Sequence, residues 1–279
     1  LRTKVKIYAS QSKEDCWQPL DDGEYQPTTL KAKEIERYLA HLNRIKHALG
    51  CDLHFLVQSA NNFPKSCGLA SSAASFAALS VAAVQAIQVL MPEKQLSQRK
   101  IMELSRQGSG SSCRSFLQPW AMWKGEEVTA VDVAYQDLKH VAILSTDAEK
   151  TVSSTEAHRN IAHSLLFKHR PQRAELRLES LLEAFKQHDW HRAYIVCWQE
   201  FWDMHALFAT ADPPFHYFNG QTLEHLNALQ EFWQRWDDGP LVTMDAGPQI
   251  HLLFRSEQTT IMQEILEYFN TRAKVITDV

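Results

Sequence analysis

Residues 61–74 combine small side chains and hydroxyls with the expected start of a long helix. Gly68 is followed closely by Ser71 and Ser72, and an Ala-rich run without Gly or Pro continues to Leu90. The first turn of a helix leaves backbone N–H groups unpaired and carries partial positive charge, so it attracts phosphate. Serine hydroxyls add further donors and can bind Mg²⁺, although no Gly-Lys-Ser/Thr of a Walker loop is present. The segment indicates a phosphate loop; an N-cap on a buried helix is the alternative.

Residues 108–115 (GSGSSCRS) place two glycines and four serines around a single arginine, Arg114. This composition predicts a flexible loop that is rich in hydrogen-bond donors. A guanidinium group forms paired hydrogen bonds with a carboxylate or a phosphate. The segment therefore indicates an anion site, with a solvated turn as the alternative.

Residues 242–248 (VTMDAGP) place Asp245 at the end of an apolar strand, beside small residues. A carboxylate in that position is well placed to face a pocket. Asp-Ala-Gly-Pro is also ordinary turn chemistry, and taken alone it favours a simple turn. The sequence contains neither a nucleophile elbow nor an HExxH pattern, which argues against Ser-His-Asp hydrolysis and a bound transition metal.

The composition is that of a globular protein. The chain has 279 residues, of which 44% are hydrophobic and 22% charged, and its net charge is -4. That charge gives no general attraction to nucleic acid or to anionic membranes. No stretch resembles a membrane span or a signal peptide; residues 69–91 come closest to a span. Five cysteines without a CxxC pair fit reduced thiols, so we expect a cytoplasmic protein with no nucleic-acid or membrane partner.

Hydrophobic periodicity and turn signals predict the elements that position these segments. Helices are expected over residues 35–49, 70–90, 95–106, 155–166, 172–188, 190–209, 222–236 and 258–272, and strands over 4–9, 53–58, 127–135, 140–145, 241–244 and 249–254. We expect 127–135 to pair with 140–145, and the last two strands to form a hairpin around Asp245. Strands mixed with helices, without strict alternation, predict an α+β fold. We place its two lobes at residues 1–150 and 151–279.

Taken together, the segments resemble a known family. Pro64-x3-Gly68-Leu69-x-Ser71-Ser72-Ala73 is similar to the phosphate-binding motif of the GHMP small-molecule kinases. The longer string NNFPKSCGLASSAASFAAL, with GSGSSCRS and MDAGP, resembles the diphosphomevalonate decarboxylase family within that superfamily. Residues 152–156 and 204–214 agree with it, and all five segments occur in the family's order.

The resemblance implies a GHMP-kinase-like fold with a mixed N-terminal lobe and a helix-rich C-terminal lobe. It implies an enzyme that uses ATP and Mg²⁺ to phosphorylate the 3-hydroxyl of mevalonate 5-diphosphate, then eliminates phosphate and CO₂ to give isopentenyl diphosphate. Alternatives within the superfamily are a phosphomevalonate decarboxylase and a mevalonate 3-kinase-like enzyme. An inactive homologue that binds nucleotide or a partner is the alternative of another class. A homodimer is an expectation from family habit alone, since the sequence itself does not show the oligomeric state.

The resemblance also assigns roles to residues. ATP phosphates contact Gly68, Leu69, Ala70, Ser71 and Ser72, and the substrate contacts Ser109, Ser111, Arg114, Ser153, Ser154 and Thr155. Mg²⁺ is bound through the hydroxyls of Ser72 and Ser111. Arg114 holds the carboxylate and diphosphate of the substrate, while Asp245 is the catalytic aspartate, either as general base or by electrostatic stabilisation.

The chain departs from the family pattern at its start. The family opens with strands that carry a Lys-Tyr-Trp-Gly-Lys-like motif, and nothing similar precedes Leu1. We therefore expect the first strands of the family to be missing from this chain, and a sheet edge in the first lobe to be exposed as a result.

Overall fold

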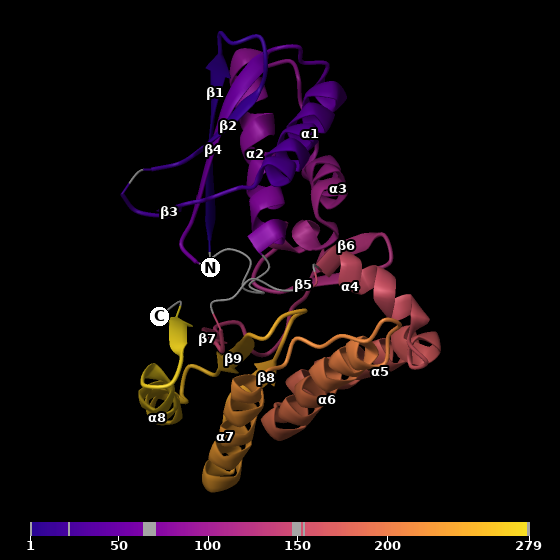
Figure 1. The fold of residues 1–279 in the computed structure, drawn as a ribbon, viewed down its shortest axis with the longest axis vertical. Coiled ribbons are helices and arrows are strands. Elements are labelled where there is room, and N and C mark those ends of the chain that lie inside the picture. Colours follow the sequence, from indigo (N-terminus) through magenta and orange to yellow (C-terminus); the bar gives the residue numbers. More distant parts are fainter. Residues whose placement is uncertain (1, 22, 64–70, 147–151, 153, 278–279) are drawn as a thin grey trace. The chain divides into compact units, whose positions relative to one another are not determined.

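The computed structural model describes residues 2–21, 23–63, 71–146, 152 and 154–277. The described residues form two compact units, which divide between Val131 and Asp132 (Figure 1). This boundary lies earlier than the predicted one after residue 150. The difference arises because the strand at Lys139–Leu144 pairs with strands of the second unit.

A small mixed sheet forms one side of the first unit. Its central strand is β4 (His54–Asn61), which pairs antiparallel with β1 (Thr3–Ser10) and parallel with β2 (Cys16–Pro19). The two-residue strand β3 (Gln26–Pro27) also pairs with β4. The predicted strands at 4–9 and 53–58 are therefore confirmed, whereas β2 and β3 carry too short a pattern to be recognised.

Three helices complete the first unit: α1 (Ala32–Leu49), α2 (Ser71–Leu90) and α3 (Gln98–Gly108). Leu79, Ala83 and Ile87 lie on one face of α2 and are buried among side chains of α1 and β4. This packing explains the Ala-rich composition of α2. By length and composition alone, residues Ser72 to Leu90 of α2 also meet the criteria for a membrane span, although the sequence predicts no span at 69–91. Because α2 packs in the core of the first unit, this match is weak evidence for a membrane span.

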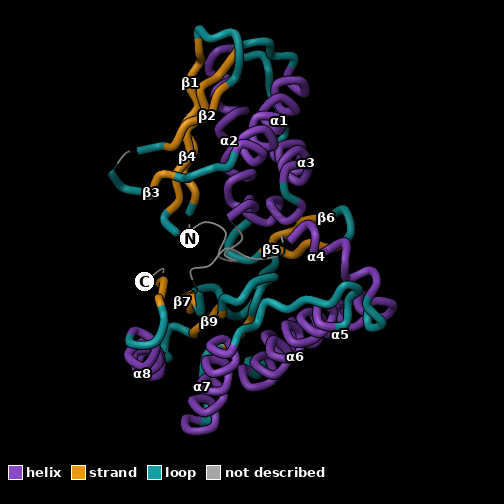
Figure 2. The backbone as a smooth tube through the Cα atoms, viewed as in Figure 1, coloured by secondary structure: helices purple, strands orange, loops and turns teal. Residues whose placement is uncertain are grey.

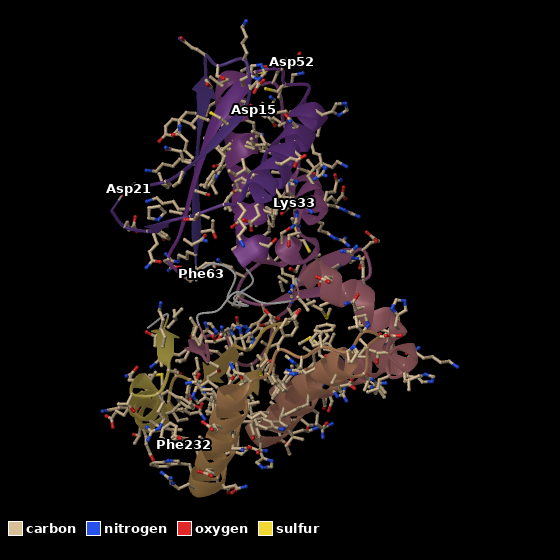
Figure 3. The ribbon with its side chains drawn as sticks, in the orientation of Figure 1. Asp15, Asp21, Lys33, Asp52, Phe63 and Phe232 are labelled. Carbon is tan, nitrogen blue, oxygen red and sulfur yellow. The ribbon has the colours of Figure 1, made fainter. Side chains whose placement is uncertain are left out.

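A buried ion pair ties α1 to the residue just before β2 and to the start of β4. Lys46 of α1 donates to Asp15 at 2.7 Å, and the backbone N–H of Phe55 donates to the same carboxylate at 2.7 Å. Asp15 is labelled in Figure 3. Both charged side chains are less than a tenth exposed. Pairing and hydrogen bonding are what make such burial tolerable, so this pair is structural.

Residues 108–115 are not the flexible loop that their composition predicts. Gly110–Phe116 form a 3₁₀ helix, η1, which packs against α2 and α3. A hairpin follows, made of β5 (Ala121–Lys124) and β6 (Glu127–Ala130), and Gly125 in its turn has a φ of 60°. The predicted pairing of 127–135 with 140–145 is therefore wrong, since β6 takes the nearby β5 as its partner.

Gly108 marks a close approach between α3 and α2. A Cβ atom there would lie 2.2 Å from Cδ1 of Phe76, whose ring is buried in the core of the unit. We expect Gly108→Ala to lower the free energy of unfolding by about 1–3 kcal/mol, because the ring or the helix must move. Denaturant unfolding measures this change. Gly220→Ala, where a Cβ meets nothing within 4 Å, is the matched control; equal stabilities of the two variants would contradict the prediction.

The second unit contains a four-stranded antiparallel sheet in the order β10 (Lys274–Thr277), β7 (Lys139–Leu144), β9 (Ile250–Phe254), β8 (Leu241–Thr243). The predicted hairpin of the strands at 241–244 and 249–254 is confirmed by β8 and β9. Strand β10 was not predicted.

Helices α6 (Trp190–Ala209), α7 (Gly220–Trp236) and α8 (Thr259–Asn270) pack on this sheet (Figure 2). The second unit also contains α4 (Ser154–Asn160), the 3₁₀ turns η2 (Ile161–His163) and η3 (Phe167–His169), and α5 (Arg170–Lys186), which packs against α6. Phe201 of α6, Phe232 of α7 (Figure 3) and Ile265 of α8 are buried in one core with the strands. The sheet and α6 to α8 are thus a single packed body.

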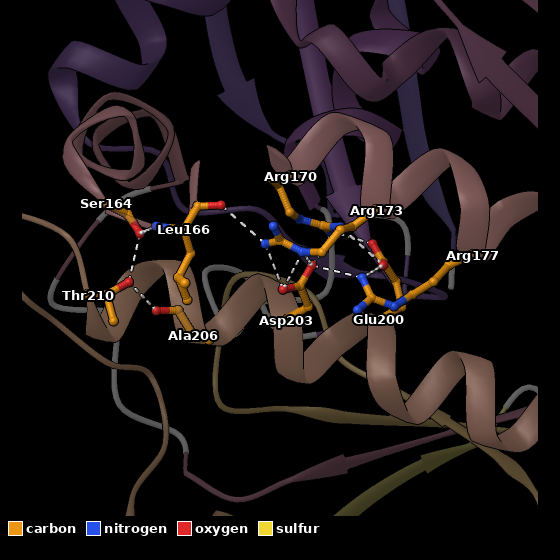
Figure 4. A network of polar contacts seen from close by, with 9 residues as sticks. All are labelled: Ser164, Leu166, Arg170, Arg173, Arg177, Glu200, Asp203, Ala206 and Thr210. Atoms are coloured by element: carbon orange, nitrogen blue, oxygen red, sulfur yellow. Dashed lines mark hydrogen bonds and ion pairs between the residues drawn. The ribbon is translucent and has the colours of Figure 1, made fainter. Parts of the chain in front are cut away.

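Ion pairs join α5 to α6 (Figure 4). Arg170, Arg173 and Arg177 recur along one face of α5, and they meet Glu200 and Asp203 of α6. Burial alone would raise the pKa of Asp203, but hydrogen bonds from Arg173 and Arg177 lower it overall. A carboxylate shared by several guanidinium groups holds the two helices in register more firmly than one exposed pair would.

Candidate active site

The start of α2 is the part of the predicted phosphate site that the structure describes. Ser71 is the first residue of the helix, the next residue, Ser72, is exposed, and the first turn contains no acidic side chain. A helix of 20 residues whose first turn has no acidic side chain suits an anion. Gly68, Leu69 and Ala70 lie outside the described residues.

The 3₁₀ helix η1 brings the second predicted segment against α2. Ser112 accepts a hydrogen bond from Ser105 at 2.6 Å, and both side chains are fully buried. The neighbouring Cys113 is also buried, whereas Arg114 is exposed and Ser111 half-buried. Two inward side chains thus anchor the segment and leave the arginine accessible.

Arginines of α1 hold the chain where it enters this segment. Arg37 donates to the backbone carbonyl of Gly108, and its guanidinium lies 5.0 Å from the centre of the Phe76 ring. Arg44 donates to the carbonyl of Gln107 at 3.5 Å. Cations are favourable at a helix C-terminus, where carbonyl groups lack partners. These bonds therefore hold the backbone in place at Ser109, the residue that follows Gly108.

Asp245 occupies the bend between β8 and β9 in the second unit. Its side chain is exposed, although Met244 before it and Gly247 after it are buried. Its backbone carbonyl accepts two hydrogen bonds, one from Gly247 N at 2.8 Å and one involving His205 Nε2 of α6 at 3.2 Å. The turn predicted from the sequence is real, and it presents a carboxylate to solvent from an anchored backbone.

The far end of this bend is fixed by α7 and β7. The hydroxyl of Thr222, in the first turn of α7, lies 3.4 Å from the carbonyl oxygen of Pro248. Gln249 accepts from Ser145 N at 2.8 Å and donates to the carbonyl of Thr146 at 2.9 Å. Residues 245–249 are therefore bonded to α6, α7 and the end of β7.

His205 lies among aromatic rings. Its ring stacks on Phe218 with centroids 4.3 Å apart and meets the edge of Phe208 at 5.2 Å. Burial lowers the pKa of His205 to about 4, although its hydrogen bond with the Asp245 carbonyl acts in the opposite direction. The imidazole is therefore neutral near pH 7, and because a carbonyl can only accept, its proton is on Nε2.

The third predicted substrate segment is described only in part. Ser154 and Thr155 are the first two residues of α4, and Ser153 lies outside the described residues. Just before them, the carbonyl of Val152 accepts a hydrogen bond from the hydroxyl of Tyr217 at 3.0 Å. This bond ties the start of α4 to the aromatic cluster around Phe208.

Two sets of side chains result, each within its own unit. The first unit contributes Ser72, Ser109, Ser111 and Arg114, which are donors suited to phosphate and carboxylate groups. The second contributes Asp245 together with the start of α4. Among the described residues, no group of three or more His, Cys, Asp or Glu side chains could hold a metal. This donor set fits Mg²⁺ that is bound mainly through phosphate oxygens, as is usual for nucleotide sites.

Comparison with known proteins identifies the family. A model described as "Diphosphomevalonate decarboxylase-like N-terminal domain" matches residues 1–134, and one described as "Mevalonate 5-diphosphate decarboxylase C-terminal domain" matches residues 140–279. The crystal structure of a mevalonate diphosphate decarboxylase from Legionella pneumophila is 43% identical with a TM-score of 0.90, covering 98% of this chain and 87% of that one.

Two further relatives extend the comparison. The diphosphomevalonate decarboxylase of Debaryomyces hansenii is 28% identical over 77% of this chain, and the match spans 58% of that relative's length. A solved structure described as a complex with MVAPP, AMPPCP and magnesium is 26% identical with a TM-score of 0.81, covering 98% of this chain and 84% of that one. These neighbours share the predicted α+β, GHMP-kinase-like fold. The chain belongs to the diphosphomevalonate decarboxylase family.

Proposed function

We propose that the protein is an ATP-dependent decarboxylase that converts mevalonate 5-diphosphate to isopentenyl diphosphate, with release of ADP, phosphate and CO₂. The observation that carries the proposal is Asp245, an exposed carboxylate on a backbone that is bonded on both sides. It stands in a chain whose two halves match the two family domains.

The proposal includes ATP and Mg²⁺ as the phosphoryl donor and its counter-ion. Support comes from the relative whose structure contains MVAPP, AMPPCP and magnesium. In this chain we assign the triphosphate to the start of α2, with Gly68, Leu69, Ala70, Ser71 and Ser72 as its contacts. The hydroxyls of Ser72 and Ser111 would bind Mg²⁺, which neutralises charge on the phosphate oxygens.

The substrate is assigned to the serine–arginine segment and the start of α4. Arg114 is exposed, so its guanidinium can form paired hydrogen bonds with the carboxylate or the diphosphate. Ser109 and Ser111 supply hydroxyl donors from the same segment, and Ser153, Ser154 and Thr155 are assigned as further contacts. By holding the carboxylate, Arg114 would orient the C–C bond that breaks when CO₂ leaves.

Asp245 is assigned to the 3-hydroxyl of the substrate. In the first step that oxygen bonds to the γ-phosphorus of ATP, ADP departs, and the hydroxyl proton is lost. In the second step the C–O bond to phosphate breaks while the C–C bond to the carboxylate supplies the electron pair of the new double bond. Asp245 would accept the proton as general base, or stabilise the positive charge that develops at C3.

The proposal extends to the surroundings of the enzyme. We assign it a cytoplasmic location, a small-molecule substrate and no nucleic-acid or membrane partner, in keeping with the net charge of -4 and with the packing of one face of α2 in the core of the first unit. A homodimer is assigned by family habit.

The decisive experiment supplies mevalonate, its 5-phosphate and its 5-diphosphate in parallel and measures CO₂ and ADP. We expect equal amounts of both products from the diphosphate alone. Both products from the monophosphate alone would instead make the protein a phosphomevalonate decarboxylase. ADP without CO₂ would indicate a 3-kinase-like enzyme, and no product from any of the three would indicate an inactive binding protein.

A further inference from the structure

We propose that His205 is a positioning residue for Asp245: its Nε2–H fixes the backbone carbonyl of Asp245 and thereby sets the direction of the carboxylate at the end of β8. The inference rests on the proposed catalytic role of Asp245 and adds to it a residue that the reaction needs although it touches no substrate.

The first argument is the exposure of Asp245 itself. Its side chain is exposed, so packing does not hold it. The orientation of the Asp245 peptide group, by contrast, is set by the two donors to its carbonyl, His205 Nε2 at 3.2 Å and Gly247 N at 2.8 Å. The direction of the Cβ follows from the backbone on both sides of the Asp245 Cα: β8 and the buried Met244 hold the preceding side, and the two donors hold the carbonyl that follows. His205 is the donor that comes from outside the bend.

The second argument is that the donor is itself held in place. The His205 ring is 4% exposed and lies parallel to Phe218, with an interplanar angle of 15°. The edge contact with Phe208 restricts it from another side. Two residues before it on α6, Asp203 is bonded to Arg173 and Arg177 of α5. The donor therefore lies on a helix that is itself held by ion pairs to α5. Residues that position an active-site group need rigid support of this kind.

The third argument is charge. A protonated imidazole would place a cation beside the Asp245 turn, which would alter the basicity of the carboxylate. The buried, neutral ring donates a hydrogen bond without adding that charge. A lysine or arginine would supply the N–H and the unwanted charge together, whereas histidine in this aromatic cluster supplies the N–H alone.

The test compares His205→Phe with His205→Gln in the full chain. Phenylalanine keeps the ring against Phe218 but has no donor, whereas the glutamine amide restores an N–H near the place of Nε2. We expect kcat for CO₂ release to fall about tenfold or more in the Phe variant, because small misplacements of a reacting group are costly. The KM for ATP should change less than twofold, and the Gln variant should recover most of the lost rate.

His41→Phe is the matched control. His41 is also fully buried, and burial followed by the charges of Arg44 and Arg37 lowers its pKa to about 4. It makes one described hydrogen bond, to Ser80 at 2.9 Å, and both residues belong to the first unit, whereas Asp245 belongs to the second. We expect this variant to lose thermal stability, as His205→Phe does, but to keep its kcat.

The inference is overturned if His205→Phe retains wild-type kcat, or if the Gln and Phe variants lose rate equally. A loss of rate in His41→Phe as large as in His205→Phe would reduce His205 to a core residue. Absence of CO₂ release by the wild type would overturn the proposed function instead. In that case ¹⁵N spectra still test the contact between His205 and the Asp245 carbonyl. A proton on Nε2 of His205, together with shifts of the Gly247 amide in His205→Phe that are reversed in His205→Gln, supports the contact. The absence of both refutes it.

Discussion

Asp245→Asn is expected to reduce CO₂ release by about 10²–10⁴-fold, the usual contribution of a positioned acid or base. Asparagine retains the shape of the side chain but neither accepts a proton at neutral pH nor carries negative charge. Folding should be unaffected, since the Asp245 side chain is exposed and the hydrogen bonds of the bend use its backbone carbonyl. Parallel measurements of CO₂, ADP and Tm test all three statements.

Asp237→Asn is a suitable control for this variant. Asp237 is an exposed aspartate in the same unit, at the turn before β8, with a left-handed φ of 48° that asparagine also tolerates. It should keep full activity. Near-normal CO₂ release by Asp245→Asn, or an equal loss in both variants, would return Asp245 to the role of an ordinary turn residue.

Arg114→Lys is expected to lower kcat/KM for the diphosphate substrate by about 10- to 100-fold despite retaining the charge. An ammonium group cannot reproduce the planar pair of N–H donors, and each lost hydrogen bond to a charged partner costs about 1.5–3 kcal/mol. The Tm should not change, because Arg114 is exposed and the burial of Ser112 and Cys113 fixes the segment. Steady-state kinetics with the diphosphate, alongside thermal melts, measure both effects.

Arg99→Lys serves as the control, since its side chain is 87% exposed and, in the part of the chain that the structure describes, its ion pair is with Glu103 of the same helix at 3.4 Å. Wild-type kinetics in Arg114→Lys would show that charge alone suffices at this position. A loss in Arg99→Lys of similar size would point instead to the general electrostatic field of the first unit.

Local pattern was enough to predict most elements. The helix predicted over 190–209 has those bounds in the structure, where Asp189 caps it by accepting from Arg192 N at 2.9 Å. The hairpin around Asp245 was likewise predictable, since a turn sequence separates two apolar strands. The helix predicted over 155–166 ends instead at Asn160, and 3₁₀ turns follow it.

The main failure of the sequence-based prediction was in deciding which strands pair with each other. Strand β7 pairs with β9 and β10, both more than a hundred residues later, and nothing in the pattern of 139–144 specifies them. The 3₁₀ helix at 110–116 was missed for a related reason. Its order depends on the buried bond between Ser112 and Ser105, whereas serine and glycine content alone favours a loop.

The sequence identified candidate site residues whose side chains have distinctive chemistry. It did not identify the residues that act through hydrogen bonds to backbone carbonyls. Asp245 and Arg114 stand out in the sequence because each is a charged residue beside small neighbouring residues. His205, Thr222 and Arg37 act on the carbonyls of Asp245, Pro248 and Gly108, and any residue has a carbonyl. His205 does lie in the segment 204–214 that carries the family resemblance, but the sequence does not show that its partner is a backbone carbonyl, because the acceptor leaves no trace there.

The order of strands in the second unit has a consequence for biosynthesis. Strand β7, with four consecutive buried residues from Val141 to Leu144, leaves the ribosome well before the strands on either side of it. The roughly one hundred residues before β9 take about 5–20 s to be translated, and β10 comes later still. The sheet of the first unit, whose strands all lie within the first 61 residues, can assemble far earlier. During translation, therefore, the apolar side chains of β7 wait longer for their strand partners than those of any strand in the sheet of the first unit.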